Sequence, residues 1–215
     1  MSSDNPTPAV PESRSIRKRR SILDAAAAVF LRKGYVGTSM DEIPALAAVS
    51  KQTVYKHFAD KQTLFSELVT STVQEASDSV HEDMRDLQDS GDIEADLRDL
   101  ARRQLDKALQ PRVLQLRRLV IGEAGRFPDL GRTFYELGPG RTIAGLATAF
   151  AGLAERGVLD LDDPQLAAEH FNWLVMSIPL NQAMLLGDDE PMDPAGLDRC
   201  AEAGVRVFLA AYRVA

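Results

Sequence analysis

The sequence predicts an all-α protein, and two patterns carry this prediction. Apolar residues recur three or four positions apart over most of the 215 residues, which is the period of an amphipathic helix, and strand-like alternation does not occur. Helix-start signals precede these segments: Ser39, Ser50 and Asp60 are candidate N-caps. Asp163-Pro164 and Asp193-Pro194 each combine a cap with a proline at the first helical position.

Three short helices are expected within the first 60 residues. The first covers about residues 15–33 and ends at Gly34, the second covers about 40–47, and the third covers about 51–57. Because a short turn separates the second helix from the third, this segment has the organisation of a helix-turn-helix. In such a unit the third helix projects beyond the second and can enter the major groove of DNA.

The third helix carries side chains that suit DNA. Val54 and Phe58 are four positions apart and can pack inward, which leaves the other side chains on the outer arc. Amide, hydroxyl and basic groups there can pair with base edges or reach phosphates. Lys61 follows in the first turn of the next helix, where a cation is unfavourable for the helix dipole and a phosphate contact would explain it. The residues predicted from this placement are Lys51, Gln52, Thr53, Tyr55, Lys56, His57 and Lys61.

Charge is divided unevenly along the chain. The formal net charge is −7, yet residues 1–66 hold 10 Lys and Arg against 6 Asp and Glu, whereas residues 67–215 hold 15 against 26. A locally basic segment on an acidic protein is the electrostatic footprint of a small nucleic-acid-binding module on a body that avoids nucleic acid. A solvated basic helix start is the alternative explanation of the same charges.

Several classes of protein are not expected from this sequence. The single Cys200 excludes an internal disulfide framework and a Cys-based zinc cage, and it fits a reducing, cytoplasmic setting. The apolar run at 143–154 is too short to cross a membrane. Residues 17–20 and 25–31 imitate a secretory signal, but Asp24 interrupts the apolar part. Residues 1–13 read as a disordered tail.

Catalysis is not expected either, and no metal or cofactor is predicted. The three histidines form no HExxH motif, and the glycine-rich segment at 138–142 lacks the lysine and the context of a phosphate-binding loop. The rival to a DNA-binding function is a helical interaction module whose basic arm, residues 14–20, meets an acidic partner or an anionic membrane. Sequence-specific DNA binding would separate the two.

The helix-turn-helix segment also resembles a known family. Residues 34–43 (GYVGTSMDEI), residues 47–58 (AAVSKQTVYKHF), Asp60-Lys61 and Leu64-Phe65 are similar to the DNA-binding domain of the TetR family of bacterial transcriptional regulators, over about residues 15–66. The resemblance implies a dimeric, all-helical regulator, usually a repressor, whose C-terminal domain binds a small ligand. It implies DNA contacts from Thr38, Gln52, Thr53, Tyr55, Lys56, His57 and Lys61, and a small core of Ile22, Phe30, Ile43, Val54 and Phe58.

Two residues depart from the family pattern. Pro44 stands where the family usually has alanine, so the second helix is expected to be bent or to start late. Ala48 stands where glycine is common, and it fits only if the backbone of the turn needs no positive φ. Both departures affect the tilt of the third helix.

The region from 67 to 215 is expected to be a helical domain for ligand binding and dimerisation. It is similar to the C-terminal domain of the AefR-like subgroup, through residues 117–130, 157–159 and 163–171. Apolar stripes on the last two helices suggest a dimer interface; the alternative is burial within one copy, which at least half of each stripe must undergo. The interface residues are Ala167, Phe171, Leu174, Ile178, Leu197, Val205, Phe208 and Tyr212.

A ligand pocket is predicted in the same region, and core packing is the alternative for each of its residues. The effector is not identified by the sequence, since aromatic walls with a few polar anchors suit many small molecules. The pocket residues are Arg117, Glu123, Phe127, Phe134, Tyr135, His170, Trp173 and Met176. The expected partners are therefore double-stranded DNA carrying a palindromic operator, a second copy of the chain and a small molecule, and no membrane.

Overall fold

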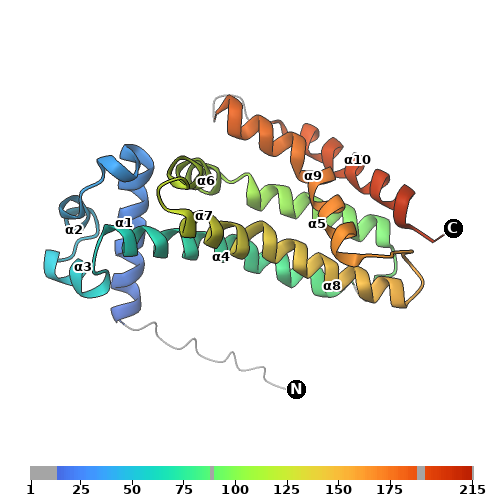
Figure 1. The fold of residues 1–215 in the computed structure, drawn as a ribbon, viewed down its shortest axis with the longest axis horizontal. Helices are drawn as coiled ribbons and strands as arrows, with labels where there is room; N and C mark the ends of the chain where they lie inside the picture. Colours follow the sequence, from blue (N-terminus) through green and yellow to red (C-terminus); the bar gives the residue numbers. More distant parts are fainter. Residues whose placement is uncertain (1–13, 88–89, 188–191, 215) are drawn as a thin grey trace, which may run out of the picture. The chain divides into compact units, whose positions relative to one another are not determined.

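The structure is a computed structural model that describes residues 14–87, 90–187 and 192–214 (Figure 1). These residues are helical, as the spacing of apolar positions predicts, and they divide into two compact units at Leu68 and Val69. No described helix is long and apolar enough to cross a membrane.

The first unit contains the three expected helices and the start of a fourth. Its elements are α1 (Arg14–Gly37), the 3₁₀ turn η1 (Met40–Glu42), α2 (Ile43–Leu46), α3 (Lys51–His57) and the first part of α4 (Lys61–Asp86), which continues into the second unit. Gly34 interrupts α1 with a φ of 72°, a backbone conformation that glycine adopts at no steric cost. The expected end of the first helix is thus confirmed.

Pro44 delays the second helix. The expected helix over 40–47 consists of η1 followed by the four residues of α2, and Pro44 lies in the first turn of α2. Proline lacks the backbone N–H that a continuous α-helix would need, but that group has no intrahelical partner in a first turn. Ser39 caps η1, its hydroxyl accepting a hydrogen bond from the Asp41 N–H. The late start predicted from Pro44 is confirmed.

The turn between α2 and α3 requires a left-handed residue. Ala48 has a φ of 51°, so the turn does need a positive φ, and the condition under which alanine was expected to fit is not met. The conformation lets the Val49 N–H donate to the Pro44 carbonyl at 3.1 Å, which closes the end of α2. The Ser21 hydroxyl donates to the Ala47 carbonyl at 2.8 Å and ties the turn to α1.

The second unit is built from long helices that run beside one another in Figure 1. They are α5 (Ile93–Ala108), α6 (Pro111–Glu123), α7 (Pro128–Tyr135), the π-helical turn η3 (Glu136–Gly140), α8 (Arg141–Glu155), α9 (Pro164–Leu186) and α10 (Pro194–Tyr212). Two of them, α9 and α10, begin at the cap-and-proline pairs Asp163-Pro164 and Asp193-Pro194, as predicted. Gly138 is non-helical, with φ −99° and ψ −105°, so the helical path is broken between α7 and α8.

An aromatic cluster lies at the centre of this unit. Phe150 of α8, Phe171 of α9 and Phe208 of α10 are fully buried, and their ring centroids are 4.9 to 5.7 Å apart. Gly204 lets α10 approach α9, because a Cβ there would lie 3.2 Å from the Leu174 carbonyl carbon. The apolar stripes of the last two helices therefore pack first against their own unit.

The strained turn gives a testable prediction. Ala48→Gly should raise the free energy of unfolding by about 0.5 kcal/mol, because a left-handed alanine costs about 1–2 kcal/mol and glycine adds about 0.4–1 kcal/mol of unfolded-state entropy. The control is Ala45→Gly, at an exposed position inside α2, which should lower stability by up to about 1 kcal/mol. Urea unfolding of both variants measures this, and equal losses would contradict the prediction.

Candidate nucleic-acid interface

Local hydrogen bonds fix the start of α3. Ser50 is its N-cap, and the Ser50 hydroxyl accepts a hydrogen bond from the Thr53 N–H at 3.1 Å. The hydroxyls of Ser50 and Thr53 are also within 2.8 Å of each other. Val54 and Phe58 are buried, as their spacing predicts, and they anchor α3 in the core of the first unit.

The opposite side of α3 presents polar and basic side chains to solvent. Lys51, Gln52, Tyr55 and Lys56 are exposed. Thr53 and His57, the other two predicted contacts on this helix, are half-buried. The structure thus brings these six side chains together on one short helix with four of them accessible, as base and phosphate contacts require.

Lys51 is paired within the protein. Its ammonium group lies 2.7 Å from a carboxylate oxygen of Asp41, and the side chains of both residues are 60% exposed. The hydrogen bond to Asp41 raises the pKa of Lys51 above its ordinary value of 10.5. The Lys51 ammonium also lies 5.8 Å from the centre of the Tyr55 ring. A phosphate would have to compete with Asp41 for this cation.

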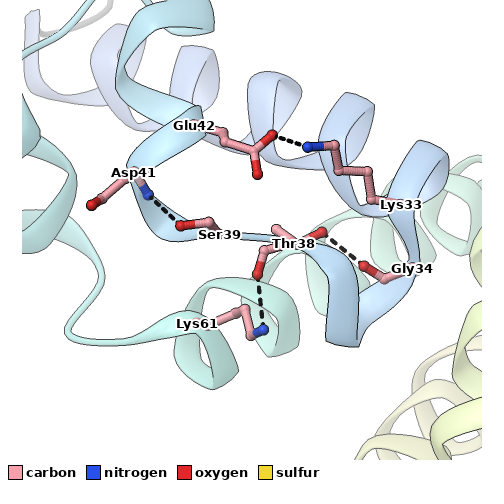
Figure 2. Close-up of polar contacts among 7 residues, drawn as sticks. All are labelled: Lys33, Gly34, Thr38, Ser39, Asp41, Glu42 and Lys61. Carbon is pink, nitrogen blue, oxygen red and sulfur yellow. Dashed lines mark hydrogen bonds and ion pairs between the residues drawn. The ribbon is translucent and has the colours of Figure 1, made fainter.

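Two of the predicted DNA contacts are used inside the first unit (Figure 2). Lys61 donates to the carbonyls of Tyr35 and Thr38 at 3.0 and 2.9 Å, and its ammonium lies 4.8 Å from the centre of the Tyr35 ring. Thr38 is 4% exposed, and its hydroxyl donates to the Gly34 carbonyl at 2.8 Å. These bonds satisfy carbonyl groups at the end of α1, so the unusual place of Lys61 has a structural explanation.

A second contact joins the end of α1 to η1. The Lys33 ammonium donates to a carboxylate oxygen of Glu42 at 2.5 Å (Figure 2). This hydrogen bond lowers the pKa of Glu42 below its ordinary value of 4.5, and the backbone N–H of Ser39 contributes in the same direction. Glu42 therefore acts partly as the capping-box residue of η1 and partly as the anchor of Lys33.

The basic segment 14–20 forms the first turns of α1. Arg19 pairs with Glu67 at 2.6 Å, and its guanidinium carbon lies 5.5 Å from the centre of the Phe58 ring. Arg19 therefore connects α1 to α4 and to the end of α3.

The second unit contains a cavity of about 70 Å³ that four predicted pocket residues line, namely Arg117, Phe134, Trp173 and Met176. Tyr135 lines an adjoining outer cavity of about 160 Å³, which shares Arg117, Phe134 and Trp173 with the inner one. His170 lies elsewhere: it is exposed, and its Nδ1 is 2.6 Å from the Tyr212 hydroxyl. Neither cavity includes Glu123 or Phe127.

Sequence reasoning missed the polar lining of the inner cavity. Gln104, Asn172 and Ser77 are buried there, and the Gln104 amide donates to the Asn172 carbonyl oxygen at 2.7 Å. A signal was present, because Gln104 interrupts the apolar stripe of α5 and Asn172 follows a core phenylalanine on α9. Polar residues at core positions of a helix are therefore candidates for the lining of a binding cavity.

The predicted dimer residues separate into two groups. Four of them are at most 1% exposed and belong to the core of the unit, so their assignment to a dimer interface is corrected: Ala167, Phe171, Val205 and Phe208. The core-facing side of each apolar stripe packs against other helices of the same unit. Leu174 and Ile178 are exposed and line an open groove with Val207, whereas Leu197 and Tyr212 are half-buried against the core.

A capped helix that presents basic and amide side chains after a tight turn, in a chain that also holds a separate helical unit, defines a helix-turn-helix transcription regulator. Residues 22–68 match the model of bacterial regulatory proteins of the tetR family, and residues 95–214 match the C-terminal domain of AefR-like transcriptional repressors. The chain belongs to the TetR family. It is therefore a DNA-binding regulator and not an enzyme, as the sequence predicts.

Solved structures agree with this assignment. A crystal structure of a TetR-family protein from Mesorhizobium loti MAFF303099 is 45% identical, with a TM-score of 0.89 over 94% of this chain and 100% of that chain. The flavonoid-responsive regulator FrrA is 35% identical, with a TM-score of 0.72 over 92% and 97%. The regulator YhgD of Bacillus subtilis (strain 168) is 39% identical over 33% of this chain, and the chain spans about a third (37%) of its length.

The internal role of Lys61 can be separated from phosphate binding. Lys61→Met should lower the free energy of unfolding by about 1–2 kcal/mol, because the carbonyls of Tyr35 and Thr38 lose a charged donor. The salt dependence of DNA binding should stay unchanged, measured by fluorescence anisotropy at several salt concentrations. The control Lys56→Met, on the exposed face of α3, should leave stability unchanged. Unchanged stability with a weaker salt dependence for Lys61→Met would contradict the prediction.

Proposed function

We propose that this protein is a homodimeric, ligand-responsive repressor that binds a palindromic operator through two copies of α3. The exposed polar face of a capped, core-anchored α3 is the observation that carries the proposal. One helix-turn-helix makes few contacts, so useful affinity needs two of them at a fixed spacing. The match to AefR-like repressors supports repression as the sign of regulation.

The exposed residues of α3 are proposed to make different kinds of contact with DNA. Gln52 reads a base edge, because its amide can pair with adenine in the major groove. Tyr55, Lys56 and Lys51 contact phosphates, and Lys51 does so by exchanging Asp41 for a phosphate oxygen. Thr53 and His57 support the helix and complete the contact face. Thr38 and Lys61 act indirectly, by holding the end of α1 against the start of α4.

The dimer is proposed to form through the open side of α9 and α10. Leu174, Ile178 and Val207 are 39%, 59% and 50% exposed, which is unusual for large aliphatic side chains on one surface. Gly204 and Ala203 lie beside them in the same groove, and such small residues allow two helix pairs to approach closely. A self-complementary face of this kind suits a two-fold interface.

A small molecule is proposed to control DNA binding from the cavity of the second unit. The similarity to FrrA, which is named as flavonoid-responsive, supports an organic effector. Binding would favour one arrangement of the dimer over another and so change operator affinity. The effector acts only to the extent that its affinity differs between the two arrangements.

Operator binding is tested by enriching genomic DNA fragments on the purified protein at near-physiological salt. We expect a palindromic site, which is lost for the Tyr55→Ala, Lys56→Ala double variant. Enrichment of no site by either protein would contradict the proposal and favour the alternative of a helical interaction module.

The enriched site then distinguishes base contacts from phosphate contacts. Gln52→Ala should relax specificity at one base pair of each half-site. The free energy that distinguishes the preferred base pair from the others there should fall by about 1–3 kcal/mol. Lys56→Ala should weaken binding to all sequences and reduce the salt slope by about 0.9 for each phosphate that is no longer neutralised. Competition assays with single-base operator variants measure both effects. A uniform loss for Gln52→Ala would contradict its reading role.

The dimer face has its own test. Ile178→Glu should convert the dimer to a monomer in analytical ultracentrifugation and weaken operator binding, because two carboxylates would be buried about the two-fold axis. Val36→Glu is the matched control, since Val36 is 68% exposed in the first unit and lies outside the groove. A dimer that survives Ile178→Glu and Val207→Glu together would exclude this interface.

A further inference from the structure

We propose that the effector is a small aromatic acid that also carries a hydroxyl group, with its ring in the outer cavity, its anionic oxygen at Arg117 and its hydroxyl at the buried amides of the inner cavity. This inference rests on the proposed function, because it names the ligand class for the same regulatory site.

The inner cavity contains buried polar atoms whose hydrogen-bonding capacity is unmet. Gln104 is 5% exposed and gives its amide N–H to Asn172, yet its own carbonyl oxygen has no donor among the described residues. Ser77 is 6% exposed, and its hydroxyl has no partner there either. A buried polar group without a partner is unfavourable, so a site of this kind favours a ligand that brings a donor.

Arg117 calls for a different group. Its Nε atom is buried without a hydrogen-bond partner among the described residues, and burial lowers the pKa of its guanidinium below the ordinary value. The guanidinium carbon lies 5.2 Å from the centre of the Phe134 ring, and Lys107 lines the same cavity. A neutral polar molecule can accept a hydrogen bond, but an anion offsets a desolvated positive charge more fully.

The volumes place the parts of the ligand. The inner cavity is about 70 Å³, whereas a cavity that accommodates a benzene molecule is about 150 Å³. The outer cavity is about 160 Å³, which is enough for one ring. Because the two cavities share Arg117, Phe134, Pro139 and Trp173, a ring in the outer one can extend a polar substituent past Arg117 into the inner one.

The outer cavity favours an aromatic ring over a flexible chain. Phe134, Tyr135 and Trp173 line it, together with Ile121 and the flat ring of Pro139. Aromatic pairs gain from stacked or edge-on geometry beyond their buried area. The class is thus defined by three demands: a ring for the aromatic walls, an anion for Arg117 and a hydroxyl donor for the carbonyl oxygen of Gln104.

The test uses 2-hydroxycinnamate, whose hydroxyl and carboxylate arms leave adjacent ring carbons on the same side, with cinnamate and methyl 2-hydroxycinnamate as partners that lack the hydroxyl and the charge respectively. Trp173 is the single tryptophan of the chain and lines both cavities, so its fluorescence reports binding directly. We expect saturable quenching by 2-hydroxycinnamate and about tenfold weaker binding of each partner compound. Isothermal titration calorimetry provides the second measurement.

Substitutions assign the two preferences to particular residues. Arg117→Gln should abolish the preference for the acid over its methyl ester, and Gln104→Leu should abolish the preference for the hydroxylated acid over cinnamate. Arg103→Gln is the matched control for charge, because Arg103 lies on α5 but is exposed and outside both cavities. It should change neither ratio. Circular dichroism of each variant shows that it is folded.

Three outcomes overturn the inference: no binding of any of the compounds, equal binding of all three, or preferences that survive both Arg117→Gln and Gln104→Leu. Operator binding by the same preparation keeps the two proposals apart. A protein that binds a palindromic site but no aromatic acid retains the proposed regulatory function and loses this effector class. A protein that binds the acid but no DNA sequence loses the proposed function, while the ligand assignment stands.

Discussion

The hydrogen bonds from Lys61 to the carbonyls of Tyr35 and Thr38 are the constraint on which the DNA-binding unit depends. Gly34 breaks α1 with a positive φ, so the carbonyl groups of Tyr35 and Thr38 that follow it lie outside the regular helix and accept hydrogen bonds from Lys61. One ammonium group satisfies them and attaches the start of α4 to the end of α1. The same contact holds the segment that leads into η1, α2 and α3. The position of α3 therefore depends on it.

The helix α3 has one side anchored in the core and one side exposed to solvent. Val54 and Phe58 fix its inner side in the core, and Ser50 fixes its first turn through local hydrogen bonds. The outer side is left free of packing constraints, which is what a surface selected for contact with DNA requires. The left-handed Ala48 is the local cost of the tight turn, and it is offset by the hydrogen bond between Val49 and Pro44.

The second unit differs from the first, because it keeps polar groups inside its core where apolar residues would be more stable. Gln104, Asn172, Ser77 and Arg117 surround a cavity next to a well-packed aromatic cluster. Proteins of ordinary stability tolerate such features at functional sites and lose stability for them. Ser77 lies on α4, the helix that begins at Lys61 in the first unit and continues into the second.

Features that depend on near neighbours in the chain were readable from residue order. Helix bounds, the caps at Ser50, Asp163 and Asp193, the break at Gly34 and the delay at Pro44 all follow from hydrogen bonds and steric limits within a few residues. The motif from Gly34 to Phe58 was also sufficient to indicate DNA binding. Apolar spacing on α3 indicated the buried side of that helix for the same local reason.

Contacts between distant segments were settled by the tertiary structure alone. The hydrogen bond between Gln104 and Asn172 spans 68 residues, and that between Lys61 and Tyr35 spans 26. No local pattern states that Thr38 is buried, or that Phe171 and Phe208 face the core while Ile178 faces outward. An apolar stripe shows that a helix face is covered; which partner covers it depends on how the whole chain packs, because burial is a property of the assembled helices and not of any one of them.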